Sequence, residues 1–70
     1  MPRKQSFGKW LTDRRTERGL GRQEVADRVG VTYAAVRSWE LDTSLPRDGN
    51  LSALCKALRA SVRQARAFAA

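Results

Sequence analysis

The sequence contains no histidine, a single cysteine and no long apolar run. Without an imidazole, the chain cannot build a Ser-His-Asp triad, a Cys-His pair or the zinc-binding H-E-x-x-H motif. Cys55 has no partner for an internal disulfide, so we expect packing alone to hold the fold. No stretch approaches the roughly 20 apolar residues of a membrane span, and the first residues lack the apolar core of a signal peptide. We therefore expect a cytoplasmic, non-enzymatic protein without metal or cofactor.

Acidic residues are also scarce. Seven Asp and Glu face fourteen Lys and Arg, which leaves a formal net charge of +7 on 70 residues. A chain of this length has room for one small core, and its 41% hydrophobic and 30% charged residues favour a folded globule over a disordered tail. The excess of positive charge favours a polyanionic partner, and nucleic acid is the leading candidate.

Apolar residues recur at helical spacing along most of the chain, so we expect an all-α domain over residues 6–70. Residues 1–5 show no such periodicity and are expected to form a flexible basic arm. Ser6, Thr32, Asp48 and Ser61 are candidate N-caps, whereas Gly19 and Gly30 are typical helix stops. Whether the last two segments form separate helices stays open. The segments are Phe7–Arg18, Gly21–Val29, Tyr33–Leu41, a stretch after Asp48 that includes Leu51 to Leu58, and a stretch after Ser61 that includes Val62, Ala65 and Phe68.

Residues 22–41 fit the steric requirements of a helix-turn-helix. Ala26 is small where the two helices must cross closely, and Gly30 supplies the left-handed backbone of the tight turn. We expect an apolar wedge to fix the interhelical angle and a second set of side chains to face outward. The wedge comprises Val25, Val31, Val36 and Trp39, and the outward set comprises Tyr33, Ala34, Arg37 and Ser38.

With residues 22–41 as its helix-turn-helix, the chain resembles the lambda-repressor-like, Cro/XRE-type helix-turn-helix domains. The resemblance implies a compact five-helix domain whose second and third helices form the helix-turn-helix. It also implies that the third helix reads the major groove of double-stranded DNA, usually as a homodimer on a palindromic operator, in transcription control. The matching residues are Phe7-Gly8, Leu11, Arg15, Gly19-Leu20, Glu24-Val25-Ala26, Val29-Gly30-Val31-Thr32, Val36, Trp39-Glu40, Pro46, Leu51, Leu54 and Leu58.

The resemblance also implies roles for individual residues. Tyr33, Ala34, Arg37 and Ser38 match positions that face the bases. Arg22 stands where such proteins hold a phosphate, usually with glutamine, and a guanidinium there should make binding more salt-dependent. Arg15 and Glu40 match an internal ion pair between the first and third helices. The full set of expected phosphate contacts is Arg22, Gln23, Thr43, Ser44 and Arg47.

Three residues depart from the family pattern. Asp42 and Arg59 stand where glycine is common, although Asp tolerates the left-handed region better than most residues. Ala65 replaces a larger apolar residue in the last helix. Phe68 either supplies the missing bulk or stays exposed as part of a dimer contact. Leu45 and Pro46 are expected to pack back on the core.

The sequence favours a Cro-like or small repressor that acts by occluding a promoter. One alternative is a protein-interaction module of antitoxin or adaptor type that uses the basic C-terminal helix, which an exposed Phe68 would favour. Another is binding of nucleic acid without sequence preference. Trp10 and Trp39 lie on apolar helix faces and are expected in the core, as is Cys55.

Overall fold

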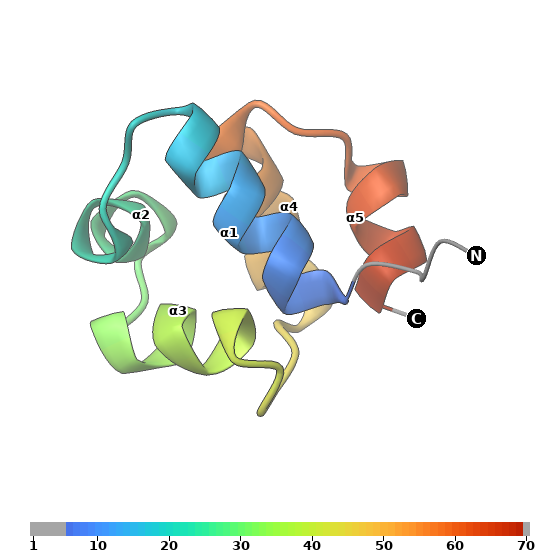
Figure 1. Ribbon diagram of the computed structural model, residues 1–70, viewed down its shortest axis with the longest axis horizontal. Helices are drawn as coiled ribbons and strands as arrows, with labels where there is room; N and C mark the ends of the chain where they lie inside the picture. The colour runs from blue at the N-terminus through green and yellow to red at the C-terminus, as the bar shows by residue number, and fades with distance from the viewer. Residues whose placement is uncertain (1–5, 70) are drawn as a thin grey trace.

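The computed structural model describes residues 6–69, which form five helices and no strand. The helices are α1 (Phe7–Glu17), α2 (Arg22–Val29), α3 (Tyr33–Glu40), α4 (Asp48–Leu58) and α5 (Val62–Ala69), as Figure 1 shows. The all-α prediction is confirmed. The expected basic arm, residues 1–5, lies outside the described residues.

Side-chain caps fix where three helices begin. The hydroxyl oxygens of Ser6, Thr32 and Ser61 accept backbone N–H groups three residues ahead, over 3.1, 3.1 and 3.2 Å. These caps satisfy donors that the first turn leaves without partners, as the sequence predicts. The prediction for Asp48 is wrong by one position. Arg47 occupies the N-cap of α4 without a side-chain hydrogen bond, and Asp48 lies in the first turn, where its charge favours the positive helix end.

The turn between α2 and α3 depends on Gly30, whose φ of +86° is left-handed. This conformation lets the N–H groups of Gly30 and Val31 both donate to the carbonyl of Ala26, over 2.8 and 2.9 Å. Ala26, Val25 and the inward residues of α3 are buried, whereas Val31 is only partly buried. The two helices therefore cross as the helix-turn-helix prediction requires.

Trp10 and Trp39 are both core residues, as predicted, and they expose 1% and 4% of their surface. Phe68 packs on Trp10 with ring centroids 6.0 Å apart, and Gln64 Oε1 accepts the indole N–H of Trp10 over 3.3 Å. Phe68 therefore supplies the bulk that the small Ala65 lacks. The remaining buried apolar residues are Phe7, Leu11, Val25, Ala26, Val36, Leu51, Leu54, Cys55, Leu58 and Ala65.

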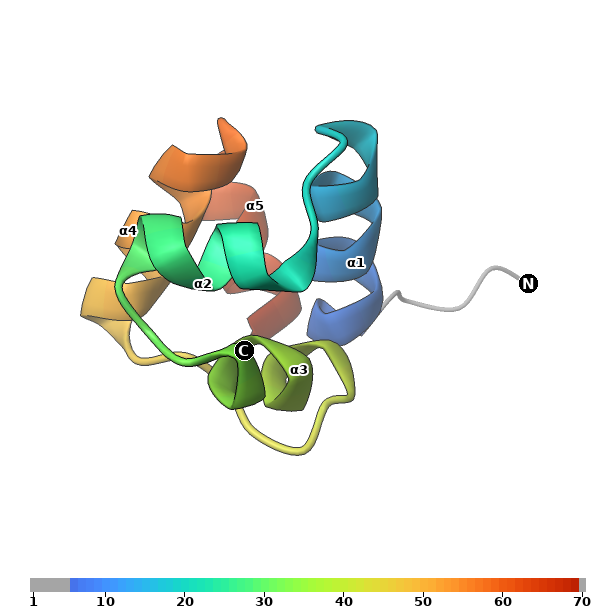
Figure 2. The ribbon, with the colours of Figure 1, turned by 90° about the vertical axis from the view of Figure 1, so that its left-hand side faces the viewer.

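The helices surround this core, and α3 packs on α1 and α2 at one side of it. Figure 2 shows α3 at the bottom, away from the C-terminal ends of α1 and α4 at the top. α4 and α5 are separate, because Arg59 adopts a left-handed φ of +53° that ends α4. Leu45 exposes 52% of its surface, so the expectation that it packs on the core is wrong, whereas Pro46 is half-buried. Within residues 6–69, every helix falls short of the length and apolar character that crossing a bilayer requires.

Candidate nucleic-acid interface

One face of α3 is open to solvent while the other is buried. Val36 and Trp39 hold the buried face, and this orientation turns Tyr33, Ala34 and Arg37 outward. Tyr33 exposes 44% of its surface although it carries a large ring. A short helix with a fixed inner face and free donors on its outer face has the shape and chemistry needed to enter a groove.

Ser38, the fourth predicted base-facing residue, is half-buried. Its hydroxyl lies 2.6 Å from the hydroxyl of Thr43, which also donates to the Ser38 carbonyl oxygen over 3.0 Å. Because Thr43 has only one hydroxyl proton, Ser38 donates its own to Thr43 when both bonds form together. The Ser38 oxygen then keeps lone pairs for a ligand but no free proton, so in this arrangement it can accept and not donate.

A buried carboxylate joins three helices beneath this face. Arg15 Nε and Nη2 donate to Glu40 over 2.5 and 3.2 Å, and Arg22 Nε donates to Glu40 Oε1 over 2.8 Å. The Glu40 side chain is only 1% exposed. We call Arg15, Arg22 and Glu40 the Glu40 cluster. The sequence suggested the pair of Arg15 and Glu40, but it did not indicate that Arg22 shares the same carboxylate.

Both charges and burial act on Glu40. Burial alone would raise its pKa, but the hydrogen bonds and charges of Arg15 and Arg22 outweigh that effect and hold the pKa below its ordinary value. The same contact with Glu40, together with the Tyr33 hydroxyl, raises the pKa of Arg22. Glu40 is therefore an anion at neutral pH, and it joins the last turn of α3 to the start of α2 and to the last turn of α1.

Arg22 keeps part of its guanidinium free. Its bond to Glu40 uses Nε, and the side chain is still 32% exposed. The planar group carries four further N–H donors on Nη1 and Nη2. Arg22 also opens α2, where backbone N–H groups favour an anion. Glu40 can thus hold Arg22 in place without occupying the donors that a phosphate would need.

A second contact at this end of α3 was not foreseen from the sequence. Asp42 has φ +61°, and its Oδ1 accepts the N–H of Gly8 over 2.9 Å, which caps the start of α1. A Cβ on Gly8 would lie 2.2 Å from the Glu40 carbonyl oxygen, so only glycine fits this approach without a shift. The sequence indicated only that Asp42 tolerates the left-handed region, because the contact with Gly8 depends on how the helices pack.

The other predicted phosphate contacts are all exposed, but they differ in how they are held. Gln23 donates one amide N–H to Asp27 over 2.9 Å and keeps its second amide N–H for another acceptor. Thr43 is fixed to Ser38, whereas no hydrogen bond or ion pair within the described range holds the side chain of Ser44 or of Arg47. The same range contains no group of three His, Cys, Asp or Glu side chains that could hold a metal ion.

Comparison with known proteins identifies the family. A family model described as helix-turn-helix matches residues 11–64. The chain belongs to the Cro/XRE-type helix-turn-helix family. A crystal structure of the P22 c2 repressor with a synthetic operator is 31% identical, with a TM-score of 0.85, over 89% of this chain and 94% of the other. The solution structure of the P22 c2 DNA-binding domain gives 29% identity and a TM-score of 0.87, over 93% and 86%.

A third structure, the biofilm regulator SinR in complex with DNA, shares the fold. Its sequence is 24% identical to that of the present chain, with a TM-score of 0.80, over 86% of this chain and 97% of the other. No curated protein sequence matches the chain. The family membership and the repressor structures together support a DNA-binding transcription regulator.

Proposed function

We propose that the protein is a sequence-specific repressor that inserts α3 into the major groove of double-stranded DNA. The observation that carries this proposal is the exposed face of Tyr33, Ala34 and Arg37 on a helix whose inner face is buried. The major groove admits an α-helix and presents a distinct pattern of donors and acceptors for each base pair. The similarity to the P22 c2 repressor, whose crystal structure contains a synthetic operator, supports DNA binding.

The chemistry of the face assigns a role to each residue. Arg37 makes paired hydrogen bonds to the O6 and N7 atoms of a guanine, and Ala34 contacts a thymine methyl group. Tyr33 reaches a base or a phosphate with its hydroxyl. Ser38 accepts from a base amino group, since its proton is committed to Thr43.

Phosphate contacts surround this face and set its register on the duplex. Arg22 holds a phosphate with its Nη atoms while Nε stays on Glu40. The start of α2 adds backbone N–H groups with the same preference for anions. The remaining contacts come from Gln23, Thr43, Ser44 and Arg47.

The protein acts as a homodimer on a palindromic operator in this proposal. Two copies of α3 would then read half-sites about 34 to 36 Å apart, one turn of the duplex. A bound dimer represses by occluding a promoter, since its docking covers the groove that another protein would need.

The test begins with selection of bound sequences from a random DNA pool. The selected duplex and a random duplex are then titrated with the wild type and with Arg37→Ala. We expect Arg37→Ala to reduce the binding free energy for the selected duplex by about 1 to 3 kcal/mol and that for random DNA by less. It should also relax the sequence preference at one base pair. Arg63→Ala removes the same charge from the exposed face of α5 and serves as the matched control. Equal losses on both duplexes would show that Arg37 does not read a base.

The packing of Phe68 bears on one alternative, and competition by random duplex and RNA tests the other. The protein-interaction alternative drew on an exposed Phe68, but that ring stacks on Trp10. Binding without sequence preference predicts that random duplex and RNA compete as well as the selected duplex does.

A further inference from the structure

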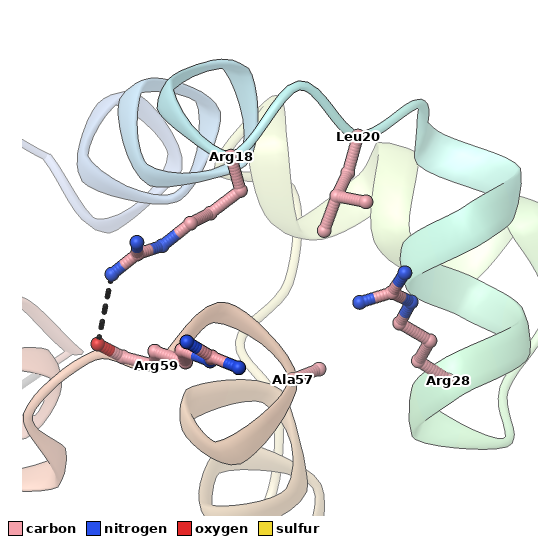
Figure 3. Close-up of a pocket in the computed structure, with 5 residues that line it drawn as sticks. All are labelled: Arg18, Leu20, Arg28, Ala57 and Arg59. Atoms are coloured by element: carbon pink, nitrogen blue, oxygen red, sulfur yellow. Dashed lines mark hydrogen bonds between the residues drawn. The ribbon is translucent and has the colours of Figure 1, made fainter.

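A small cavity lies where the C-terminal ends of α1, α2 and α4 meet. Its volume is about 220 Å³. In Figures 1 and 2, the C-terminal ends of α1 and α4 lie at the top of the domain and α3 lies at the bottom. We call it the arginine cavity. Its lining residues, drawn in Figure 3, are Arg18, Leu20, Arg28, Ala57 and Arg59.

Arg18 forms a fixed wall of the cavity. Its Nε donates to the carbonyl of Leu58 over 2.8 Å, and its Nη2 donates to the carbonyl of Arg59 over 3.3 Å. Figure 3 shows this side chain reaching across to the end of α4. These bonds satisfy carbonyls that the end of a helix leaves without partners, so one guanidinium is held at a defined place.

Within the described part of the chain, the other two arginines line the cavity without a hydrogen-bonded partner for their guanidinium groups. No hydrogen bond or ion pair in residues 6–69 holds the guanidinium of Arg28 or Arg59, and Figure 3 shows both extending into the space between α2 and α4. The acids nearest to them in sequence are engaged elsewhere. Glu17 pairs with Arg14, Glu24 accepts the N–H of Gly21, and Asp27 accepts from Gln23.

The ends of the three helices explain part of this arrangement, since cations favour helix C-termini. Each helix end is equivalent to about half a negative charge, however, and that charge is felt only within the last turn. Three full positive charges exceed what three such ends supply. No acidic side chain among residues 6–69 lines the cavity, so its three guanidinium groups make the lining positively charged.

We propose that the arginine cavity binds a compact, phosphate-bearing small molecule with at least two negative charges. The planar guanidinium fork matches the geometry of phosphate oxygens. The cavity is smaller than the roughly 300 to 1,000 Å³ of most drug-sized ligand sites, and none of its lining side chains is aromatic, so it offers no ring on which a base could stack. Leu20 and Ala57 are its apolar lining residues. The proposal goes beyond DNA binding and does not depend on it.

The test uses inorganic pyrophosphate as the probe and isothermal titration calorimetry at fixed ionic strength. We expect saturable binding of one pyrophosphate per chain. Arg28→Gln and Arg59→Gly should each weaken it about tenfold, the effect of losing one charged hydrogen bond. Arg28 is exposed on α2, and glycine suits the left-handed φ of Arg59, so both variants should fold. Arg63→Gln removes one charge from α5, outside the cavity, and should change the affinity by less than about twofold.

Thermal unfolding gives a second readout, because a ligand that binds only the folded state raises its stability. Pyrophosphate should raise the unfolding midpoint of the wild type and of Arg37→Ala, but much less that of Arg28→Gln. Equal losses of affinity in Arg28→Gln and Arg63→Gln would overturn the proposal, because they would show attraction by net charge alone. So would binding of an acidic peptide without binding of pyrophosphate, which would indicate a protein partner.

Discussion

Two groups of arginines in this domain differ in one respect, the presence of a carboxylate. In the Glu40 cluster, Arg15 and Arg22 share a side chain that is only 1% exposed. In the arginine cavity, Arg18, Arg28 and Arg59 surround a space with no acid among the described residues that line it. Glu40 holds Arg15 and Arg22 in place, although Arg22 keeps its Nη donors. No carboxylate among the described residues holds Arg28 or Arg59. Arginine therefore supports the fold in the Glu40 cluster, and we propose that it binds an anion in the arginine cavity.

The largest effect is expected from Glu40→Ala. This change leaves two guanidinium groups facing each other at a mostly buried site, and breaking such a pair costs about 3 kcal/mol. That is a large share of the stability of a small domain. Urea unfolding followed by circular dichroism measures the change.

Glu17→Ala is the matched control, because Glu17 also pairs with an arginine but is exposed. It should leave the urea midpoint almost unchanged, since exposed ion pairs contribute little. Similar losses in the two variants would contradict the distinction between the Glu40 cluster and an ordinary surface pair.

The pH dependence of stability should report the same carboxylate. The pKa of Glu40 lies below its ordinary value of 4.5, so its contribution is complete above that value and is lost as the pH falls through the lower folded pKa. We expect the difference in unfolding free energy between the wild type and Glu40→Gln to narrow as the pH decreases from about 6 to about 3. A difference that stays constant over this range would mean that the charge of Glu40 is not what stabilises the domain.

Removing one arginine from each group separates their roles on DNA. Arg22→Ala should weaken binding about tenfold on selected and random duplexes alike, and should lower the slope of log affinity against log salt by about one. Arg28→Ala removes the same charge from the arginine cavity and should leave that slope nearly unchanged. Fluorescence anisotropy at several salt concentrations measures both. A slope change that is larger for Arg28→Ala would place the duplex at the cavity.

The smallest effect is expected from Arg59→Gly, and its sign is opposite. Arg59 is held at φ +53°, which costs a residue with a side chain about 1 to 2 kcal/mol. Glycine relieves this strain, but it also increases the conformational entropy of the unfolded chain, which offsets part of the stabilisation. We expect a net stabilisation of about 0.5 kcal/mol by urea unfolding. Destabilisation would indicate that the Arg59 side chain does more for the fold than its exposed position suggests.

The elements of this fold were predictable because local rules act on single residues. Gly30, Thr32 and the apolar spacing of α3 identify the helix-turn-helix from the sequence alone. The exposure of Tyr33, Ala34 and Arg37 followed from the same spacing, since Val36 and Trp39 leave only one face free.

The contacts between distant residues were harder to predict. Arg22 and Glu40 are 18 residues apart, and Gly8 and Asp42 are 34 apart. Spacing along one helix says nothing of such pairs, since they depend on how the helices pack. The arginine cavity was missed for the same reason. Its arginines come from three helix ends that are brought together only by the fold.

The most direct test of the central claim is a titration of the isotopically labelled protein with the selected duplex, followed by NMR. If α3 reads the groove, the largest amide shifts will fall at Tyr33, Ala34 and Arg37 and at the start of α2, while Arg18, Arg28 and Arg59 stay nearly unchanged. Shifts centred on those three arginines, with α3 unaffected, would contradict the claim.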